Sequence, residues 1–456
     1  MDYEAVIGLE THVQLKTKSK MWCGCANEFG APPNTNVCPV CLGLPGVLPV
    51  ANEEALRLTA LTGLLLNCAI PPYAKFDRKN YFYPDMPKNY QITQYDKPST
   101  INGYVDFEFN GGISRVRITR AHLEEDVGKN FHFERHSGVD FNRAGVPLME
   151  IVSEPDISSA DMAYEYLNAL KDILVYGGVS DCDKEKLGAK IEIKNMNSFS
   201  GARKALAYEI PRQIEALKNG GTLVQSTRRW DDVTGTTEEM RTKEHAHDYR
   251  YFPEPDLMPF QPTEAWLGEV SRRVVELPLA RKQRFMRDYQ LPAPDAQTFV
   301  WDVPLGNYFE SIAERAKNPK AAANWIINNL RAKMTESQTT LTELKFKPGA
   351  IPELIELVDT GKISSRIAQD VFAEMFASGE PPSVIVQKKG LAQVSDAGAI
   401  EKFCDEAIAA NPGPAADFKA GKTAALNFLK GQVMKLSKGK ANPALVGEIL
   451  GRKLKP

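Results

Sequence analysis

Hydrophobic and polar residues alternate between residues 3 and 15, which predicts a β-strand with one buried face. Glu10 and His12 lie on its polar face, roughly 6–7 Å apart by the rise of a strand. That spacing suits binding of one shared ion, a hydrogen bond between the two side chains, or an ordinary half-exposed polar face. Extended patterns recur at residues 116–120, 147–152 and 189–194. Glu150 interrupts the apolar run of 147–152, so its charge requires a partner or a metal ion.

Helical periodicity marks residues 52–67, the stretch after Ser158 or Ser159, and residues 201–221, where Pro211 predicts a kink or break. After about residue 270 the strand patterns end. We expect helices there at 321–334, 352–359, 365–378, 397–411, 422–436 and 443–453. Residues 76–91 combine aromatic and polar side chains with two prolines, which predicts a loop that either lines a site or packs rigidly.

Three adjacent acids, Glu124, Glu125 and Asp126, follow the extended run at 116–120. Neighbouring carboxylates raise one another's pKa unless a cation neutralises them. A solvated acidic loop explains this triplet taken alone. Glu10 and Glu150 are further acids at inward positions of predicted strands, and together these residues favour a metal site. Glu192 faces the same way as two lysines of its strand, so an ion-paired strand surface explains it as well as a ligand role does.

The chain has 456 residues, which predicts two to four domains, and its net charge is -2. Nucleic acid would therefore contact a local basic patch. The best candidate comprises Lys435, Lys438 and Lys440, although a solvated lysine loop explains them equally well. No apolar run approaches the roughly 20 residues that span a bilayer, so we expect a cytoplasmic protein without a membrane segment.

Four of the seven cysteines form two close pairs, Cys23 with Cys25 and Cys38 with Cys41. In a reducing compartment such a group is more typical of a metal site than of disulfides. Four thiolates complete a tetrahedral zinc shell and leave no open position. We therefore expect a structural zinc ion, held in a loop at residues 22–48.

Several stretches together resemble the B subunit of the bacterial aspartyl/glutamyl-tRNA amidotransferase, over nearly the whole chain. The most specific are 7–13 (IGLETHV), 77–84 (DRKNYFYP), 119–129 (TRAHLEEDVGK), 147–156 (PLMEIVSEPD), 248–256 (DYRYFPEPD) and 431–443 (GQVMKLSKGKANP). The resemblance implies an α+β fold. Its parts are an antiparallel-sheet cradle domain with a glutamine-synthetase-like kinase core at 1–275, a helical domain at 276–395 and a helical, tRNA-binding tail domain at 396–456.

The activity implied by the resemblance is that of a glutamine-hydrolysing, ATP-dependent ligase of translation. The side-chain carboxylate of Asp or Glu misacylated onto tRNA(Asn) or tRNA(Gln) is phosphorylated and then amidated with ammonia. The implied partners are an amidase A subunit, which releases the ammonia, and a small C subunit, in a heterotrimer. The implied cofactors are ATP, Mg²⁺ and Zn²⁺. The implied magnesium residues are Glu10, His12, Glu125 and Glu150, and the three glutamates among them are the implied catalytic residues. The implied cofactor-binding residues are His12, Glu124 and Glu192. Strand alternation alone pairs Glu124, not Glu125, with His122.

One segment departs from the family pattern. Between Asp183 and Glu192 the family carries an additional strand with a metal-site aspartate, whereas here residues 184–191 alone join the two. Either Asp181 or Asp183 substitutes for that acid, or the kinase site is weakened. A tRNA-binding or assembly subunit with an impaired kinase site is therefore the alternative function. A zinc-stabilised phosphoryl-transfer enzyme that acts alone is a third.

Overall fold

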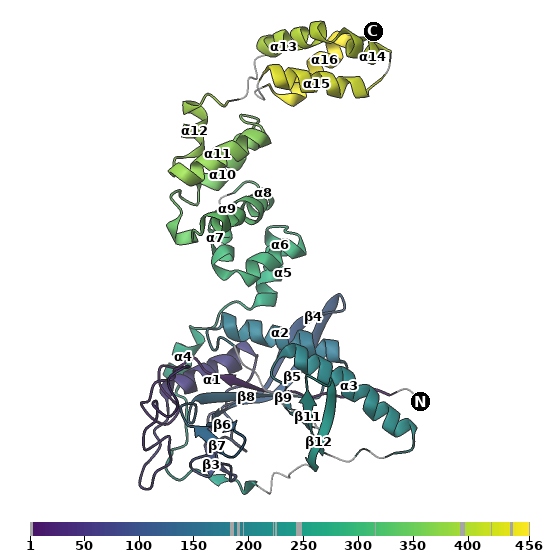
Figure 1. Cartoon of the computed structure of the whole chain (residues 1–456). Coiled ribbons are helices and arrows are strands. Elements are labelled where there is room, and N and C mark those ends of the chain that lie inside the picture. Colours follow the sequence, from purple (N-terminus) through teal and green to yellow (C-terminus); the bar gives the residue numbers. More distant parts are fainter. Residues whose placement is uncertain are drawn as a thin grey trace. The chain divides into compact units, whose positions relative to one another are not determined.

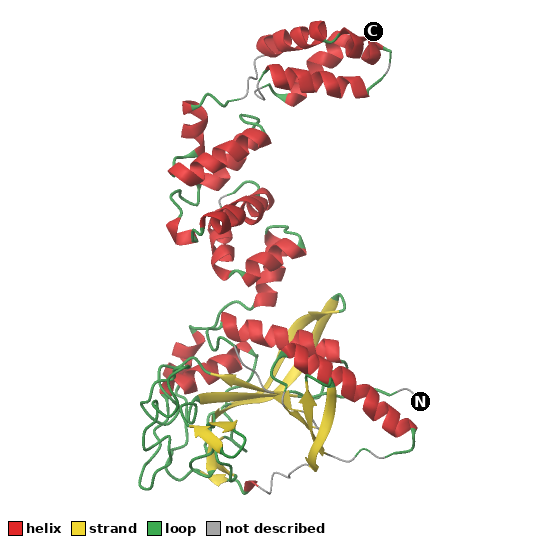
Figure 2. Ribbon diagram, in the orientation of Figure 1, coloured by secondary structure: helices red, strands yellow, loops and turns green. Residues whose placement is uncertain are grey.

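The computed structural model describes residues 3–182, 187–188, 192–194, 196–221, 223, 226–242, 249–314, 316–392, 397–420, 422–437 and 441–455. The chain divides into two compact units, Met1–Ala280 and Arg281–Pro456 (Figure 1). The first combines strands with helices, and the regular elements described in the second are helical (Figure 2). The predicted α+β class is therefore confirmed. The kinase-core description and the three domain boundaries stay predictions.

A five-stranded antiparallel sheet organises the first unit. Its strands, in spatial order, are β4 (Thr100–Phe109), β5 (Gly112–Glu125), β8 (Pro147–Ser153), β1 (Glu10–Gln14) and β9 (Leu187–Gly188). The predicted alternation of β1 is confirmed, because Leu9, Thr11, Val13 and Leu15 are buried whereas Glu10 is exposed. One face of this sheet is therefore apolar and the other polar.

Three helices form the apolar layer of the first unit: α1 (Glu53–Leu65), α2 (Ala160–Tyr176) and α3 (Phe199–Lys218). α1 and α2 pack on β4, α1 also contacts β5, and α3 packs on α2. Asn52 and Ser159 cap α1 and α2 by accepting backbone hydrogen bonds, as their sequences predict. α3 runs through Pro211 as one helix, so no break occurs. A proline removes one backbone donor, and the remaining helix bonds keep the element continuous.

β5 changes the face on which its apolar residues lie. Val116 and Ile118 belong to the core, but Ala121 and Leu123 take these positions farther along. The register between β5 and β8 shifts directly after Ile118, which places a β-bulge at Thr119. Because successive side chains of a strand alternate, the extra residue turns the following polar side chains away from the core. These are Arg120, His122 and Glu124.

Smaller sheets complete the first unit. One has the order β13 (Phe252–Pro253), β2 (Asp77–Asn80) and β3 (Tyr90–Thr93); another joins β10 (Glu192–Lys194), β11 (Ser226–Asp231) and β12 (Thr236–Thr242); and β6 (Lys129–His132) pairs with β7 (Ser137–Asp140). The predicted loop at 76–91 thus contains β2 and the start of β3. Since β3 packs against β5, this sheet lies beside the end of β5 that carries the acids. α4 (Glu264–Ser271) packs on α1.

The second unit has two separate hydrophobic cores. The first core lies among α5 (Pro278–Asp288), α6 (Ala293–Trp301), α7 (Val303–Ala313), α8 (Pro319–Trp325), a π-helix (Ile326–Leu330), α9 (Arg331–Ser337), a 3₁₀ turn (Leu341–Glu343), α10 (Ala350–Asp359), α11 (Ser365–Ser378) and α12 (Pro382–Lys388). The second lies among α13 (Ala397–Ala410), α14 (Pro412–Lys419), α15 (Ala424–Leu436) and α16 (Pro443–Leu454). The six helices predicted here are confirmed, although a π-helix interrupts the one at 321–334.

Candidate functional site

A row of three polar residues crosses the middle of the five-stranded sheet. His12 of β1 is the register partner of Glu150 of β8, and Glu150 is also the partner of His122 of β5. Residues paired in this way project to the same face of a sheet. Both imidazoles approach one oxygen, since Nε2 of His12 lies 3.7 Å and Nε2 of His122 lies 3.4 Å from Oε2 of Glu150.

Glu124 joins this row from the next site-facing position of β5. Its Oε1 lies 3.1 Å from Nε2 of His12, and its side chain is almost fully buried. His12, Glu124 and Glu150 each offer one ligand atom, and these atoms lie within 4.8 Å of one another. Nδ1 of His12 and Nδ1 of His122 are buried and have no hydrogen-bond partner among the residues that the structure describes. The polar face of the sheet therefore carries a compact group of two carboxylates and an imidazole.

The charges in this group shift the pKa values of its members. Burial alone lowers the pKa of His12, but the charge of Glu124, the hydrogen bond to it and the charge of Glu150 raise it to about 9. Burial works against ionisation of Glu124, yet the charge and hydrogen bond of His12 lower its pKa to about 2. Desolvation holds the pKa of His122 below its usual value. The carboxylate of Glu124 thus stays ionised, as binding of a divalent cation requires.

These donors fit a divalent metal ion. Magnesium favours carboxylate oxygens and keeps several waters, which matches two carboxylates at a partly open site. An imidazole ligand also suits softer first-row metals.

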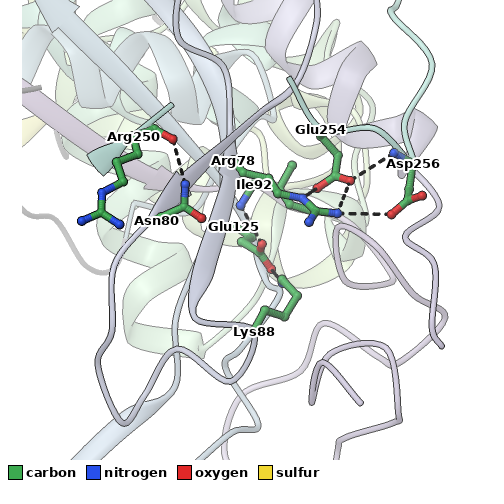
Figure 3. A network of polar contacts seen from close by, with 8 residues as sticks. All are labelled: Arg78, Asn80, Lys88, Ile92, Glu125, Arg250, Glu254 and Asp256. Carbon is green, nitrogen blue, oxygen red and sulfur yellow. Dashed lines mark hydrogen bonds and ion pairs between the residues drawn. The ribbon is translucent and has the colours of Figure 1, made fainter. Parts of the chain in front are cut away.

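Glu10 and Glu125, two of the predicted metal-site residues, lie outside the group of three. Glu10 is exposed on the polar face of β1, two positions from His12. The carboxylate of Glu125 pairs with Nζ of Lys88 at 2.5 Å and accepts a hydrogen bond from the backbone N–H of Ile92 at 2.9 Å (Figure 3). Alternation along β5 explains the difference, because Glu124 shares the face of His122 and Glu125 does not. Glu124, and not Glu125, therefore lies in the group with His12 and Glu150, and the choice of metal ligands stays a prediction.

Aromatic residues from the motifs at 77–84 and 248–256 lie close to this acidic group. Burial raises the pKa of Tyr81 and of Tyr251, and the negative charge of Glu124 raises both further. The ring of Tyr251 stacks on that of Tyr95 at 4.2 Å. Nζ of Lys79 lies 4.9 Å from the ring centre of Tyr249. Lys79 and Tyr81 could not be assigned to a site from sequence, since residues 76–91 show no clean periodicity, and the contact with Tyr249 and Tyr251 joins segments that are distant in sequence.

Arg78 connects the motif at 77–84 to the motif at 248–256 through hydrogen bonds. Arg78 of β2 makes two hydrogen bonds to the carboxylate of Glu254, at 2.6 and 2.7 Å, and a third to Asp256 at 3.2 Å (Figure 3). Its guanidinium also lies 4.2 Å from the ring centre of Tyr90. The side-chain amide of Asn80 donates to the carbonyl of Arg250 at 2.8 Å (Figure 3). These contacts hold residues 249–256 against β2.

The four cysteines of the loop at 22–48 come together as predicted. The sulfur atoms of Cys23, Cys25, Cys38 and Cys41 lie within 4.8 Å of one another. Those of Cys38 and Cys41 are 3.9 Å apart, close to the ~3.8 Å edge of a tetrahedron with zinc–sulfur bonds of about 2.3 Å. The donor set and spacing fit a zinc ion.

Lys20, a buried lysine that the sequence analysis did not identify, lies beside this cluster. Lys20 has 0% of its surface exposed. Its Nζ donates to the carbonyl of Asn36 at 2.9 Å and lies 3.7 Å from Sγ of Cys41. Burying an ammonium group is unfavourable unless a negative charge compensates it. Four thiolates around one divalent ion carry a net negative charge, which provides that compensation.

The remaining predicted site residues lie partly outside the described residues. Lys435 is in the last turn of α15. Lys438, Lys440, Asp183 and most of 184–191 lie outside the described residues, as does the side chain of Glu192, whose backbone belongs to β10. In the described part of the chain no helix is long and apolar enough to cross a membrane.

Comparisons with known proteins agree over nearly the whole length. A family model described as the GatB/GatE catalytic domain matches residues 5–268, and one described as the GatB domain matches residues 307–454. The B subunit of the aspartyl/glutamyl-tRNA(Asn/Gln) amidotransferase of Carboxydothermus hydrogenoformans is 50% identical, with 99% of each chain covered. The proteins of the same name from Caldanaerobacter subterraneus subsp. tengcongensis and Persephonella marina are 49% and 48% identical, with 100% of each chain covered. The chain therefore belongs to the family of aspartyl/glutamyl-tRNA(Asn/Gln) amidotransferase B subunits.

Proposed function

We propose that the chain is the subunit of a tRNA-dependent amidotransferase that activates a carboxylate for amidation. The substrate is Asp or Glu misacylated onto tRNA(Asn) or tRNA(Gln). An oxygen of its side-chain carboxylate attacks the γ-phosphorus of ATP, and ADP leaves. Ammonia then attacks the carbonyl carbon, phosphate leaves with the carbon–oxygen electron pair, and loss of a proton gives the amide. The group of His12, Glu124 and Glu150 supports this proposal, because phosphoryl transfer needs ionised ligands for a cation.

The residues of the site have distinct proposed roles. Glu124 and Glu150 hold a divalent cation, and His12 positions Glu124 through their 3.1 Å contact. When bound, magnesium supplies positive charge that offsets the phosphate oxygens. Glu10 stands close enough along β1 to serve an outer coordination shell through water. The pair of Lys88 and Glu125 fixes the end of β5 against β3.

The remaining parts support assembly in this proposal. Cys23, Cys25, Cys38 and Cys41 hold a structural zinc ion that fixes the loop at 22–48. An amidase A subunit supplies the ammonia and a small C subunit completes a heterotrimer. The helices from α13 to α16, with Lys435 at the end of α15, bind tRNA.

The shortened segment before Glu192 supports one alternative, a tRNA-binding or assembly subunit with an impaired kinase site. The alignment with the first relative runs over 476 positions, whereas this chain has 456 residues, so the chain lacks residues that the relative has. We expect the compact geometry of the acidic group to leave a working site. Either function predicts tRNA binding, and phosphoryl transfer separates them.

The test uses the complex reconstituted with its partner subunits. Glu-tRNA(Gln) and ATP labelled at the γ-phosphate are supplied without ammonia or glutamine, and label on the aminoacyl-tRNA is measured. The wild-type complex should transfer label. Glu124→Gln should transfer about 10²–10³-fold less, by comparison with loss of one charge-stabilising contact. Glu134→Gln, an exposed acid in the turn between β6 and β7, is the matched control and should match wild type. Tight tRNA binding by wild type without transfer would support the alternative.

A further inference from the structure

Arg120 differs from the other two arginines of β5. Those two form ion pairs with carboxylates at 2.6 Å: Arg115 with Asp106 and Arg117 with Asp156. Among the described residues no carboxylate pairs with Arg120. Its Nη1 donates a hydrogen bond to the carbonyl of Tyr95 at 3.3 Å, and its buried Nε has no acceptor within the described part of the chain.

The β-bulge at Thr119 places Arg120 on the same face as the acidic group. Arg120 precedes His122 by two positions, so both side chains project to the polar face of the sheet. Its register partner on β8 is Val152, two positions from Glu150. The ring of Tyr95, whose carbonyl anchors the guanidinium, stacks on Tyr251. Arg120 therefore lies at the rim of the candidate site, between the sheet and the aromatic residues.

An unpaired and partly buried guanidinium is an unfavourable arrangement unless an anion completes it. The carboxylates of the site do not do so: Glu124 contacts His12, and Glu150 contacts both His12 and His122. Both carboxylates are thus paired with histidines and not with Arg120. The planar, forked guanidinium matches two oxygens of a phosphoryl group.

We propose that Arg120 binds a phosphoryl oxygen of the substrate, opposite the cation held by Glu124 and Glu150. This inference rests on the proposed function and deepens it by naming the residue that binds the transferred group. The phosphoryl group belongs either to the γ-position of ATP before transfer or to the activated carboxylate after it. Arg120 is therefore a catalytic residue that contacts the reacting group, and the described contacts with protein satisfy only part of its hydrogen-bonding capacity.

The test compares Arg120→Gln and Arg120→Lys with Arg117→Gln in the reconstituted complex. Arg117 lies on the same strand, is exposed and is ion-paired, so its variant should transfer label as wild type does. For Arg120→Gln we expect a fall in kcat/KM of about 10²–10³-fold. Arg120→Lys should recover part of the loss, and added guanidinium ion at millimolar concentration should partly rescue Arg120→Gln. A structural role would give no such rescue.

Binding measurements distinguish the two sources of the phosphoryl group. If Arg120 contacts the γ-phosphate, Arg120→Gln loses affinity for ATP while its affinity for ADP is unchanged. If it contacts only the group after transfer, affinity for both nucleotides is kept and kcat falls. Glutaminase activity and zinc content of each variant complex report correct folding. Wild-type transfer by a folded Arg120→Gln complex would overturn the inference. No transfer by wild type would instead overturn the proposed function.

Discussion

Nε2 of His12 lies 3.1 Å from Oε1 of Glu124, although the strand β8 separates the strands that carry them. The two side chains meet above β8, beside Glu150. An ion bound at this point would join β1, β5 and β8. A mutation that prevents ion binding should therefore lower phosphoryl transfer and also weaken the packing of these three strands.

Glu124→Gln and Glu125→Gln should fail in different ways, because the two carboxylates have different partners. Glu124→Gln should lose phosphoryl transfer and recover part of it at raised magnesium. Glu125→Gln breaks the buried pair with Lys88, which typically costs about 3–5 kcal/mol, so its melting temperature should fall without magnesium rescue. Transfer and thermal unfolding measured on both variants check this. Magnesium rescue of Glu125→Gln would restore the ligand role that the resemblance implies.

One tightly bound zinc ion per chain is expected in the reduced protein. Cys38→Ser should release it and increase proteolysis within residues 22–48, because four thiolates are required to close the shell. Cys404→Ala, a buried cysteine of the second unit, is the control that should keep its zinc. Metal analysis of the freshly purified proteins decides the matter, and a zinc-free wild type would refute the expectation.

Lys20→Met should weaken zinc retention while leaving all four thiolates in place. Removing an outer-shell partner commonly lowers metal affinity 10–100-fold, and here the lost group is a buried cation 3.7 Å from Cys41. Zinc release to a coloured chelator measures the effect. Lys18→Met, at an exposed position nearby, should release zinc at the wild-type rate. Equal rates in both variants would show that Lys20 does not act on the metal.

Removal of residues 397–456 should abolish productive tRNA binding and leave ATP binding largely unchanged. These residues have their own hydrophobic core, separate from that of α5 to α12, so their loss exposes little of the rest. tRNA affinity of the truncated complex should be compared with that of the full complex at one fixed salt concentration, because phosphate contacts weaken with salt. Unchanged affinity would place the tRNA contacts elsewhere in the chain.

Glu209 should make the first unit sensitive to acid. Burial raises its pKa, but hydrogen bonds from Arg212, Thr237 and Gln213 outweigh this and hold the pKa below the ordinary 4.5. A lowered pKa stabilises the fold above pH 4.5, and this contribution is lost as pH falls through the folded-state value. Glu209→Gln should lower stability at neutral pH by about 1.5–3 kcal/mol and converge with wild type in acid. Urea unfolding across pH, with exposed Glu215→Gln as control, measures both.

Local patterns were sufficient to predict β1, the capped helices and the cysteine cluster, because each depends on residues near in sequence. The contact of His12 with Glu124 depends on which strands pair and in what register, and no local periodicity contains that information. Alternation from His122 did favour Glu124 over Glu125, and the structure agrees with that simpler reasoning. The burial of Lys20 beside the cysteines could not be predicted from sequence, because an isolated lysine is normally exposed. The proline in α3 predicted a kink or break, and the helix continues through it without a break while packing against α2.

β4 and β5 form a β-hairpin, and the bulge at Thr119 determines which changes in chain length this hairpin tolerates. Deleting Thr119 would remove the bulge and keep His122 and Glu124 on the polar face, because Ile118 and Arg120 would then alternate directly. Inserting one more residue between Ile118 and His122, without a second bulge, would send His122 and Glu124 toward the apolar core and turn Ala121 and Leu123 outward. Inserting or deleting residues in the turn between β4 and β5 lengthens or shortens the hairpin without inverting it. Natural variation in hairpin length should therefore concentrate in the turn at Asn110 and Gly111, and the spacing from Ile118 to Glu124 should be either the present one, with the bulge, or one residue shorter, without it.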